Sequence, residues 1–421
     1  MIETFLIFFQ ILFIGLLIFY SIPSSIIQVT FNSSSLNLLM INLIIFMNIL
    51  LIYSFFAIGN IYLFFVLFFS SLYLFMKSNK KKYFHFKIEY LLIYFYIFSI
   101  SIVIANQLEL GWDAKFFWFL KTISFYQNNN LFDLGKLPAT DYPHLGSYIW
   151  SFFWKFPFDK FEYLGRIFYV FFYVVSIFYF CETFKTNKLN KIIFASLIIL
   201  ITYNYELFSG NQEVLIFCLV LFSTKIVFEI LTKKIKNPKF AVILLLLSFN
   251  SAIWIKNEGL FLIGFMLFLI LILGNLNLTE KRIICFGSIL AIMIRLIIFK
   301  FQNSGLESFE FEKTLNLEFF ENIIVNLKTI FFYSTVYILS LPAILLGLIL
   351  MFVNLYLFKV DKVQIFIISY AILNIFFILA AFLLSVENVE WQVRVGLKRV
   401  MFESSSFYLL TSAYLFNKLK E

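Results

Sequence analysis

The chain has 421 residues, of which 62% are hydrophobic and only 14% are charged, and its mean hydropathy is +0.93. Soluble domains carry about 25% charged residues, so the composition excludes an ordinary soluble protein and predicts an all-α, polytopic integral membrane protein. The formal net charge of +9 would suggest nucleic acid for a soluble chain, but in a membrane protein the placement of the cations sets the topology, and we expect no nucleic-acid partner.

Segments that could cross a membrane recur along the whole chain. A span needs about 20 mostly apolar residues, and we predict about thirteen spans. They cover residues 5–27, two within 36–76, 90–105, 162–184, 192–207, 214–231, 240–255, 260–278, 283–298, 337–358, 363–384 and 400–416. The first segment is expected to be a retained span rather than a removable signal peptide. No separate soluble domain is predicted within the single domain 1–421.

The short loops between these spans alternate in charge. The loop 77–87 and those that follow residues 184, 231, 278, 358 and 416 are rich in lysine, and the positive-inside rule places them in the cytoplasm. Most of the other loops carry acids, among them the segment 301–328. One orientation therefore fits the whole chain, with residues 106–161 forming an extracytoplasmic loop.

The loop 106–161 is the most polar long stretch, and it contains amphipathic pieces rich in Trp and Phe that suit juxtamembrane helices at the membrane–water boundary. Asp113 opens a helix-like run in this loop. A helix cap or a solvated acid is one interpretation. The other is a general base, because a carboxylate among Trp112, Phe116 and Phe117 would be partly desolvated.

The sequence Asp141-Tyr142-Pro143-His144 is the second candidate in this loop, for substrate binding. Pro143 stiffens the chain and favours an extended Tyr142. His144 is interpreted either as a hydrogen-bonded histidine at the membrane boundary or as a residue that binds a ligand or transfers a proton.

Two short outer turns add further charged candidates. Glu213 begins a span, where it could complement the helix dipole or take part in chemistry. Lys256 and Glu258 lie between two spans, where they could neutralise each other or contact a substrate.

A basic cluster lies in the last outer loop, where the positive-inside rule disfavours it. Its members are Arg394, Lys398 and Arg399, and they could pair with Glu387, Glu390 or Glu403 or bind a lipid phosphate. Arg295, inside a predicted span, must face the protein interior or reach the boundary with its long side chain.

Other site classes find little support in the sequence. No phosphate-binding glycine motif, HExxH or GxSxG is present, and the three cysteines and two histidines suggest neither a disulfide framework nor a histidine metal cage. A divalent ion near Asp113 and Glu213 is the one cofactor that the pattern leaves open.

The order of these features resembles the C superfamily of polytopic glycosyltransferases. An outer loop carries WDAKFFWFLKTISFY and then YPHLGSYIWSFFWKF, and the next span begins at EYLGRIFY. The resemblance is to the branch of the dolichyl-phosphate-mannose–protein mannosyltransferases and aminoarabinose transferases. It assigns Asp113 to the family's catalytic acid and Glu213 to a second acid. The Lys256–Gly259 turn and Arg394 or Arg399 match later family positions.

The resemblance implies transfer of a sugar from a polyprenyl- or dolichyl-phosphate donor to a glycan, lipid or protein acceptor, with inversion at the anomeric carbon. Asp113 would deprotonate the acceptor, while Lys256, Arg394 and Arg399 would hold the phosphate. The expected location is a bacterial inner membrane with the site on its outer side. A transporter or flippase for lipid-linked glycans, and a glycan polymerase or ligase, are the alternatives.

Overall fold

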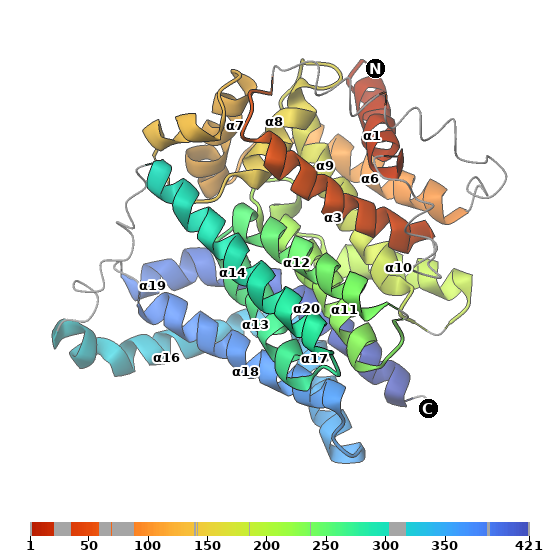
Figure 1. The fold of residues 1–421 in the computed structure, drawn as a ribbon, viewed down its shortest axis with the longest axis vertical. Coiled ribbons are helices and arrows are strands. Elements are labelled where there is room, and N and C mark those ends of the chain that lie inside the picture. Colours follow the sequence, from red (N-terminus) through yellow and green to blue (C-terminus); the bar gives the residue numbers. More distant parts are fainter. Residues whose placement is uncertain are drawn as a thin grey trace.

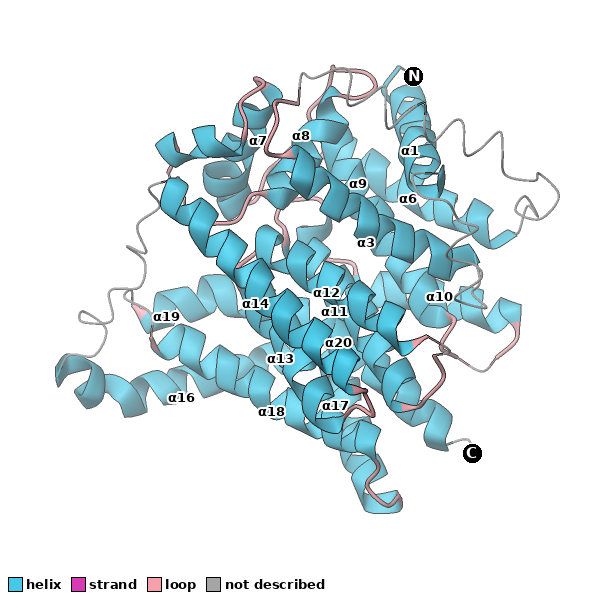
Figure 2. Cartoon of the chain, viewed as in Figure 1, coloured by secondary structure: helices cyan, strands magenta, loops and turns pink. Residues whose placement is uncertain are grey.

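The computed structural model describes residues 2–20, 35–58, 88–138, 142–184, 186–235, 237–302, 317–384 and 388–419, together with Phe69 and Thr140. These residues form helices joined by loops and contain no strand (Figure 2). The all-α prediction is confirmed for this part of the chain. Figure 1 shows the longer helices packed side by side, with the first and the last helix, α1 and α20, reaching the edge of the bundle.

The helices follow in chain order. They are α1 (Ile2–Tyr20), α3 (Ser35–Tyr53), α6 (Ile88–Asn106), α7 (Phe119–Tyr126), α8 (Leu145–Lys155), α9 (Tyr163–Cys181), α10 (Lys188–Thr202), α11 (Glu213–Leu231), α12 (Pro238–Ile255), α13 (Glu258–Leu273), α14 (Leu278–Phe301), α16 (Leu317–Ser340), α17 (Pro342–Leu357), α18 (Lys362–Leu383), α19 (Val389–Gln392) and α20 (Lys398–Leu419). Among the described residues there are also two π-helical turns, η1 (Ala114–Trp118) and η5 (Val393–Leu397), and two 3₁₀ turns, η2 (Leu131–Lys136) and η3 (Tyr205–Leu207).

Eight of the described helices are long and apolar enough to cross a membrane, and these are α3, α6, α9, α11, α12, α14, α16 and α18. Three shorter apolar helices, α1, α13 and α17, coincide with further predicted spans or parts of them. The chain is thus a membrane protein by composition and helix length. Residues 59–87, apart from Phe69, lie outside the described part, so the prediction of two spans within 36–76 stays a prediction.

The predicted single span 337–358 is wrong. Helix α16 ends at Ser340 and α17 begins at Pro342, so the chain breaks within that segment. Proline has no N–H to continue the preceding helix, but it fits the first turn of a new one. Helix α16, which ends at this break, is long and apolar enough to be a candidate span of its own. The sequence pattern did not indicate that span.

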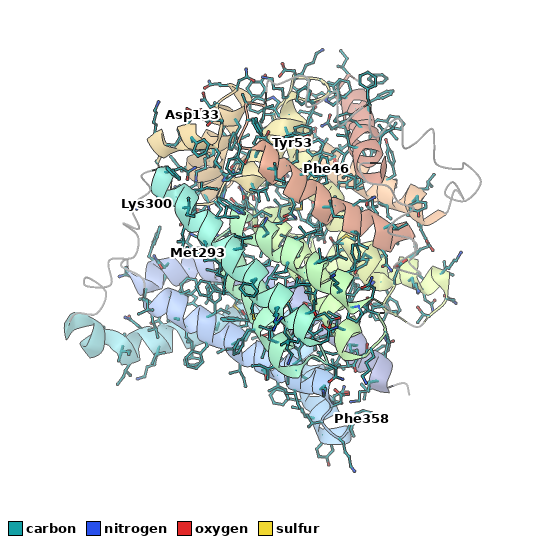
Figure 3. All side chains as sticks on the ribbon, in the orientation of Figure 1. Phe46, Tyr53, Asp133, Met293, Lys300 and Phe358 are labelled. Atoms are coloured by element: carbon teal, nitrogen blue, oxygen red, sulfur yellow. The ribbon has the colours of Figure 1, made fainter. Side chains whose placement is uncertain are left out.

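Helices α9 and α11 form the centre of the bundle. All of α9 and nearly all of α11 are buried, whereas α14 and α16 expose most of their apolar side chains. Such exposed apolar faces fit contact with lipid, because lipid replaces the protein core as their apolar surroundings. Figure 3 helps to orient the bundle: Asp133 and Lys300 lie toward the end that carries α7, and Phe358 lies at the other end.

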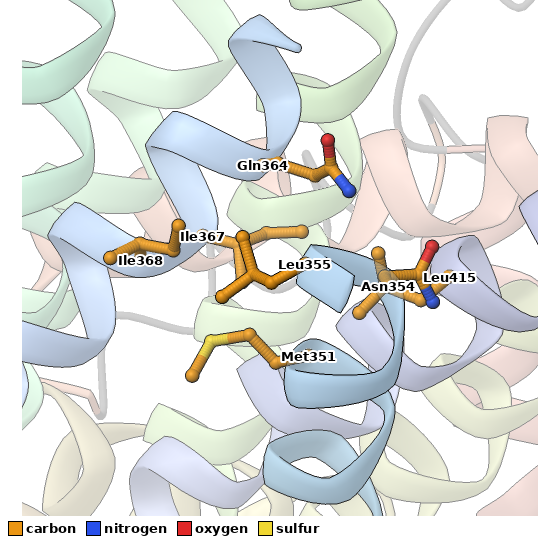
Figure 4. A pocket seen from close by; sticks show the side chains of 7 residues that line it. All are labelled: Met351, Asn354, Leu355, Gln364, Ile367, Ile368 and Leu415. Carbon is orange, nitrogen blue, oxygen red and sulfur yellow. The ribbon is translucent and has the colours of Figure 1, made fainter. Parts of the chain in front are cut away.

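The side of the bundle formed by α17, α18 and α20 is tightly packed. Met351, Asn354 and Gln364 line a crevice there that is too narrow to admit a water molecule (Figure 4). This crevice lies away from the charged residues singled out in the sequence, and we assign it to helix packing.

Candidate functional site

The loop that carries Asp113 is fastened to the start of α11. The Gly111 N–H donates to the Ser209 carbonyl at 2.8 Å, and the Ala114 N–H donates to Asn211 Oδ1 at 3.1 Å. A Cβ at position 111 would lie 2.8 Å from Asn211 Nδ2, so a larger residue there would displace the Asn211 side chain that holds the loop. Asp113, between the two hydrogen-bonded residues, is thereby held beside the first turn of α11.

Asp113 forms an ion pair with Arg399, although 285 residues separate them in the sequence. The guanidinium lies 2.7 Å from Asp113 Oδ2 and 3.8 Å from Glu213 Oε1, so one arginine joins two of the predicted acids. Asp113 directly precedes η1. After η5, one residue, Lys398, comes before Arg399. Single π-helical turns are frequent at functional sites, and here two of them flank one ion pair.

Asp113 is not a helix cap. It lies at the N-terminal end of η1 but makes no side-chain hydrogen bond to the backbone of that turn. Its carboxylate is therefore available to Arg399, and the capping interpretation of Asp113 is wrong.

Lys256 lies among three carboxylates, at the break between α12 and α13. Its ammonium is 2.6 Å from Glu403 Oε1, 3.0 Å from Glu213 Oε1 and 3.3 Å from Glu258 Oε1. Burial alone would lower the pKa of Lys256, but the three carboxylates raise it well above its usual range. The pairing of Lys256 with Glu258 is one part of a larger charge cluster.

The charge cluster, as we name Asp113, Glu206, Glu213, Lys256, Glu258, Arg399 and Glu403, has a buried part and an accessible edge. The side chains of Glu213 and Glu403 are 0% exposed, and that of Lys256 is 5% exposed. Asp113 and Arg399 retain 16% and 20% exposure, and Glu258 retains 23%. A substrate would therefore meet Asp113, Arg399 and Glu258 first, with Glu213 and Lys256 behind them.

Sequence reasoning missed Glu206 and named Glu403 only as a pairing partner. Glu206 lies in η3 and accepts a hydrogen bond of 2.7 Å from Asn211 Nδ2, the same amide that holds the Asp113 loop. Burial and the nearby Glu213 raise the pKa of Glu206 to about 7. For Glu403, the available signal was an acid inside an otherwise apolar predicted span, which is expensive unless it is paired.

The electrostatic setting of Asp113 suits a proton acceptor. Burial raises the pKa of Asp113, Arg399 acts in the opposite direction, and Glu213 adds to the rise, so the net pKa lies above the usual value. A carboxylate with a raised pKa is a stronger base than a solvated one. Despite its burial, the pKa of Arg399 is raised by Glu213 and Asp113, which keeps the guanidinium charged.

The other two cations of the predicted basic cluster do not join the charge cluster. Arg394 is exposed, pairs with Glu390 and donates from Nε to Tyr333 Oη at 2.6 Å. Lys398 is exposed as well. The interpretation of Arg394 as a surface ion pair is thus the one that the structure supports, and Glu387 lies outside the described residues.

The Tyr142–His144 segment forms part of the packed wall beside the cluster. Tyr142 stacks on Phe117 with a centroid distance of 5.1 Å. His144 is buried, bonds Ser54 Oγ at 2.9 Å and packs against Trp254 at the end of α12. Burial lowers the pKa of His144, so its ring is neutral. Asp141 lies outside the described residues.

Arg295 faces the protein interior and donates to Asn257 Oδ1, which lies between Lys256 and Glu258. It thus borders the charge cluster.

Three buried polar atoms of the cluster have no hydrogen-bond partner among the described residues: Glu213 Oε2, Glu403 Oε2 and Arg399 Nε. Buried polar atoms are usually satisfied, so they are available to a ligand or to water. The described residues contain no group of three or more His, Cys, Asp or Glu side chains placed to hold a metal ion.

No protein-family model, no curated protein and no solved structure matches this chain.

Proposed function

We propose that the protein is a membrane glycosyltransferase that moves a sugar from a polyprenyl- or dolichyl-phosphate donor to an acceptor. The observation that carries the proposal is the Asp113–Arg399–Glu213 arrangement, with Lys256 behind it. Four charged positions that the family resemblance singles out, in four separate segments, meet in one place. A purely structural role would require no such assembly of buried charges, since these are costly to desolvate.

In the reaction, the hydroxyl or amine of the acceptor attacks the anomeric carbon of the sugar. Its proton passes to Asp113, and the bond between the anomeric carbon and the phosphate oxygen breaks. The lipid phosphate leaves as an anion, so the step needs cationic stabilisation more than a general acid. Attack opposite the leaving phosphate gives inversion at the anomeric carbon.

Arg399 is the cation best placed to meet the phosphate. It is the accessible cation of the cluster, and its Nε has no hydrogen-bond partner among the described residues. A guanidinium can offer several N–H groups to phosphate oxygens at once.

Lys256 has a different role from the phosphate binding that the sequence suggested. It is buried among three carboxylates, so a phosphate approaching it would meet negative charge. In the proposed mechanism Lys256 is a positioning residue that holds Glu213 and Glu403, and Glu213 in turn holds Arg399.

The testing experiment places purified full-length protein in sealed proteoliposomes with a panel of radiolabelled polyprenyl-phosphate sugars and membrane-extract acceptors. Covalent transfer of label to an acceptor, with inverted anomeric configuration, is the expected result. Movement of intact donor between leaflets without transfer would contradict the proposal and favour a transporter of lipid-linked sugars. Retention of configuration would contradict the single-displacement mechanism.

A further inference from the structure

A polar cavity lies at the opposite end of the bundle from the charge cluster. It has a volume of about 170 Å³ and lies where α9 ends and where α3, α6 and α10 begin. Drug-sized ligands occupy pockets of about 300 Å³ or more, so this cavity suits a small polar group.

The rim of this cavity carries equal numbers of positive and negative side chains. Lys188 and Lys191 come from the first turn of α10, where a spacing of three residues places them on one face. Glu89, in the first turn of α6, and Glu182, at the end of α9, are the acids. Lys188, Lys191 and Glu89 form no ion pair with another described side chain, so their charges remain available.

The two helices that contribute Glu89 and the lysines to the cavity, α6 and α10, meet in a seam with exposed apolar side chains. The Tyr96 hydroxyl of α6 donates to Ser196 Oγ of α10 at 2.6 Å, which holds these two helices together. Leu91 on α6 and Leu197 on α10 are exposed large hydrophobic residues. A molecule with a polar head and apolar tails would meet both chemistries here.

We propose that this cavity binds the head group of a phospholipid that carries both a phosphate and a primary amine. The phosphate would lie against Lys188 and Lys191, the amine against Glu89 and Glu182, and the acyl chains along the α6–α10 seam. A purely anionic head group would have its charge opposed by two acids, whereas a head group with both charges complements the whole rim. This proposal does not rest on the proposed glycosyl transfer.

The experiment measures lipid binding to the purified full-length protein by native mass spectrometry. The probes are phosphatidylethanolamine, phosphatidylglycerol and phosphatidylcholine with identical acyl chains at equal concentration. The wild type should retain phosphatidylethanolamine in preference to the other two. Lys188→Gln/Lys191→Gln should lower that retention about thirtyfold, as expected for the loss of two phosphate-binding lysines.

A second variant tests the acidic side of the cavity. Glu89→Gln removes a carboxylate that would bind the amine of phosphatidylethanolamine and repel the anionic head group of phosphatidylglycerol. The preference for phosphatidylethanolamine over phosphatidylglycerol should therefore fall. Lys239→Gln is the matched control, because Lys239 is an exposed lysine in the first turn of α12, away from the cavity. It should behave as the wild type.

Two results would overturn the proposal. One is equal retention of the three lipids by the wild type. The other is an unchanged preference in both cavity variants, each shown to be folded by its elution and its thermal unfolding. Displacement of the lipid by soluble O-phosphoethanolamine at the same concentration would contradict the contribution of the apolar seam.

Discussion

The longer helices begin in different ways at the two ends of the bundle. At the end opposite the charge cluster, α10, α12, α14 and α18 each begin with an Asn or Asp whose side chain accepts a backbone N–H. These caps are Asn187, Asn237, Asn277 and Asp361. At the end that carries the cluster, α9, α11 and α13 begin beside Glu162, Gln212 and Asn257, none of which makes a side-chain capping bond, whereas the short turns η2 and η3 there are capped by Asn130 and Asn204.

At the cluster end, the polar side chains are used for other contacts. Asp113 and Glu213 contact Arg399, while Asn257 accepts a hydrogen bond from Arg295. An omitted cap costs about 1 kcal/mol, and burying charges costs more. The long helices that begin beside the cluster therefore give up local stability to gather charged groups, as functional sites do, whereas those that begin at the opposite end are capped.

The largest expected effect comes from removing the cation at the centre of the cluster. Lys256→Met leaves Glu213 and Glu403 buried without their neutralising partner, so we expect a loss of about 3–5 kcal/mol in the free energy of unfolding. Denaturant unfolding in mixed micelles measures it. Lys256→Arg, which keeps the charge, should lose much less.

Lys418→Gln provides the contrast at the other end. Lys418 pairs with Asp361 at 2.7 Å, but both side chains are partly exposed. Surface pairs contribute about 0–1 kcal/mol, so the loss should be small. Equal losses for Lys256→Met and Lys418→Gln would remove the distinction between the two ends.

A second effect concerns the pH dependence of transfer. Arg399 lowers the pKa of Asp113, in opposition to its burial. Arg399→Gln should therefore raise that pKa and leave more of the base protonated at neutral pH. The rising limb of the pH–rate profile should move to higher pH, with a smaller movement for Arg399→Lys. A limb that stays in place in Arg399→Gln would show that Asp113 is not the titrating base.

A third effect concerns stability. Burial and Glu213 raise the pKa of Glu206 to about 7 from 4.5. The folded chain thus holds this proton more tightly than the unfolded chain does. The resulting stabilisation is complete below the ordinary pKa of Glu206 and is lost as the pH rises through about 7.

Thermal unfolding from about pH 5 to pH 8 tests this expectation. The wild type should lose stability relative to Glu206→Gln as the pH rises, because glutamine can still accept the Asn211 hydrogen bond but does not titrate. Glu390→Gln removes an exposed acid and is the control. The stability difference between this variant and the wild type should not change with pH in this way. A difference between wild type and Glu206→Gln that is constant with pH would contradict the assignment.

The smallest expected effect is at a cap. Asn277 accepts the Glu280 N–H and forms a reciprocal capping box with that residue. Asn277→Ala should cost about 1 kcal/mol of stability and leave transfer unchanged at a temperature where the variant is folded. A loss of transfer by the folded variant would show that the two ends are coupled.

Much of the fold could be predicted from composition and hydrophobic pattern. The apolar segments predict most helices of the bundle, because lipid and core both require internally bonded helices. The division at Pro342 was missed because only Leu341 separates the two helices. This residue is itself apolar, so the apolar segment looks continuous in the sequence. Burial could not be predicted from the pattern either: α9 and α14 are both apolar, but only their packing decides which one faces lipid.

The site could be predicted only in part. An acid or a base in a loop predicted to lie on the outer side is visible in the sequence, which is how Asp113, Glu213, Lys256 and Arg399 were selected. Their partners depend on contacts between distant segments. Arg394 and Arg399 look alike in the sequence, yet one turn of helix places Arg394 on the surface and Arg399 against Asp113. Glu206 falls in the last two residues of the predicted span 192–207, and an acid at the end of a span looks like an ordinary boundary residue.

The most direct test of the central claim is single-turnover transfer from a bound polyprenyl-phosphate sugar, comparing wild type, Asp113→Asn and Arg394→Gln. Asp113→Asn keeps the size of the side chain and removes the proton acceptor. We predict that it still binds donor but transfers at least about a hundredfold more slowly, while Arg394→Gln transfers at the wild-type rate. A folded, donor-bound Asp113→Asn that transfers at the wild-type rate would contradict the account.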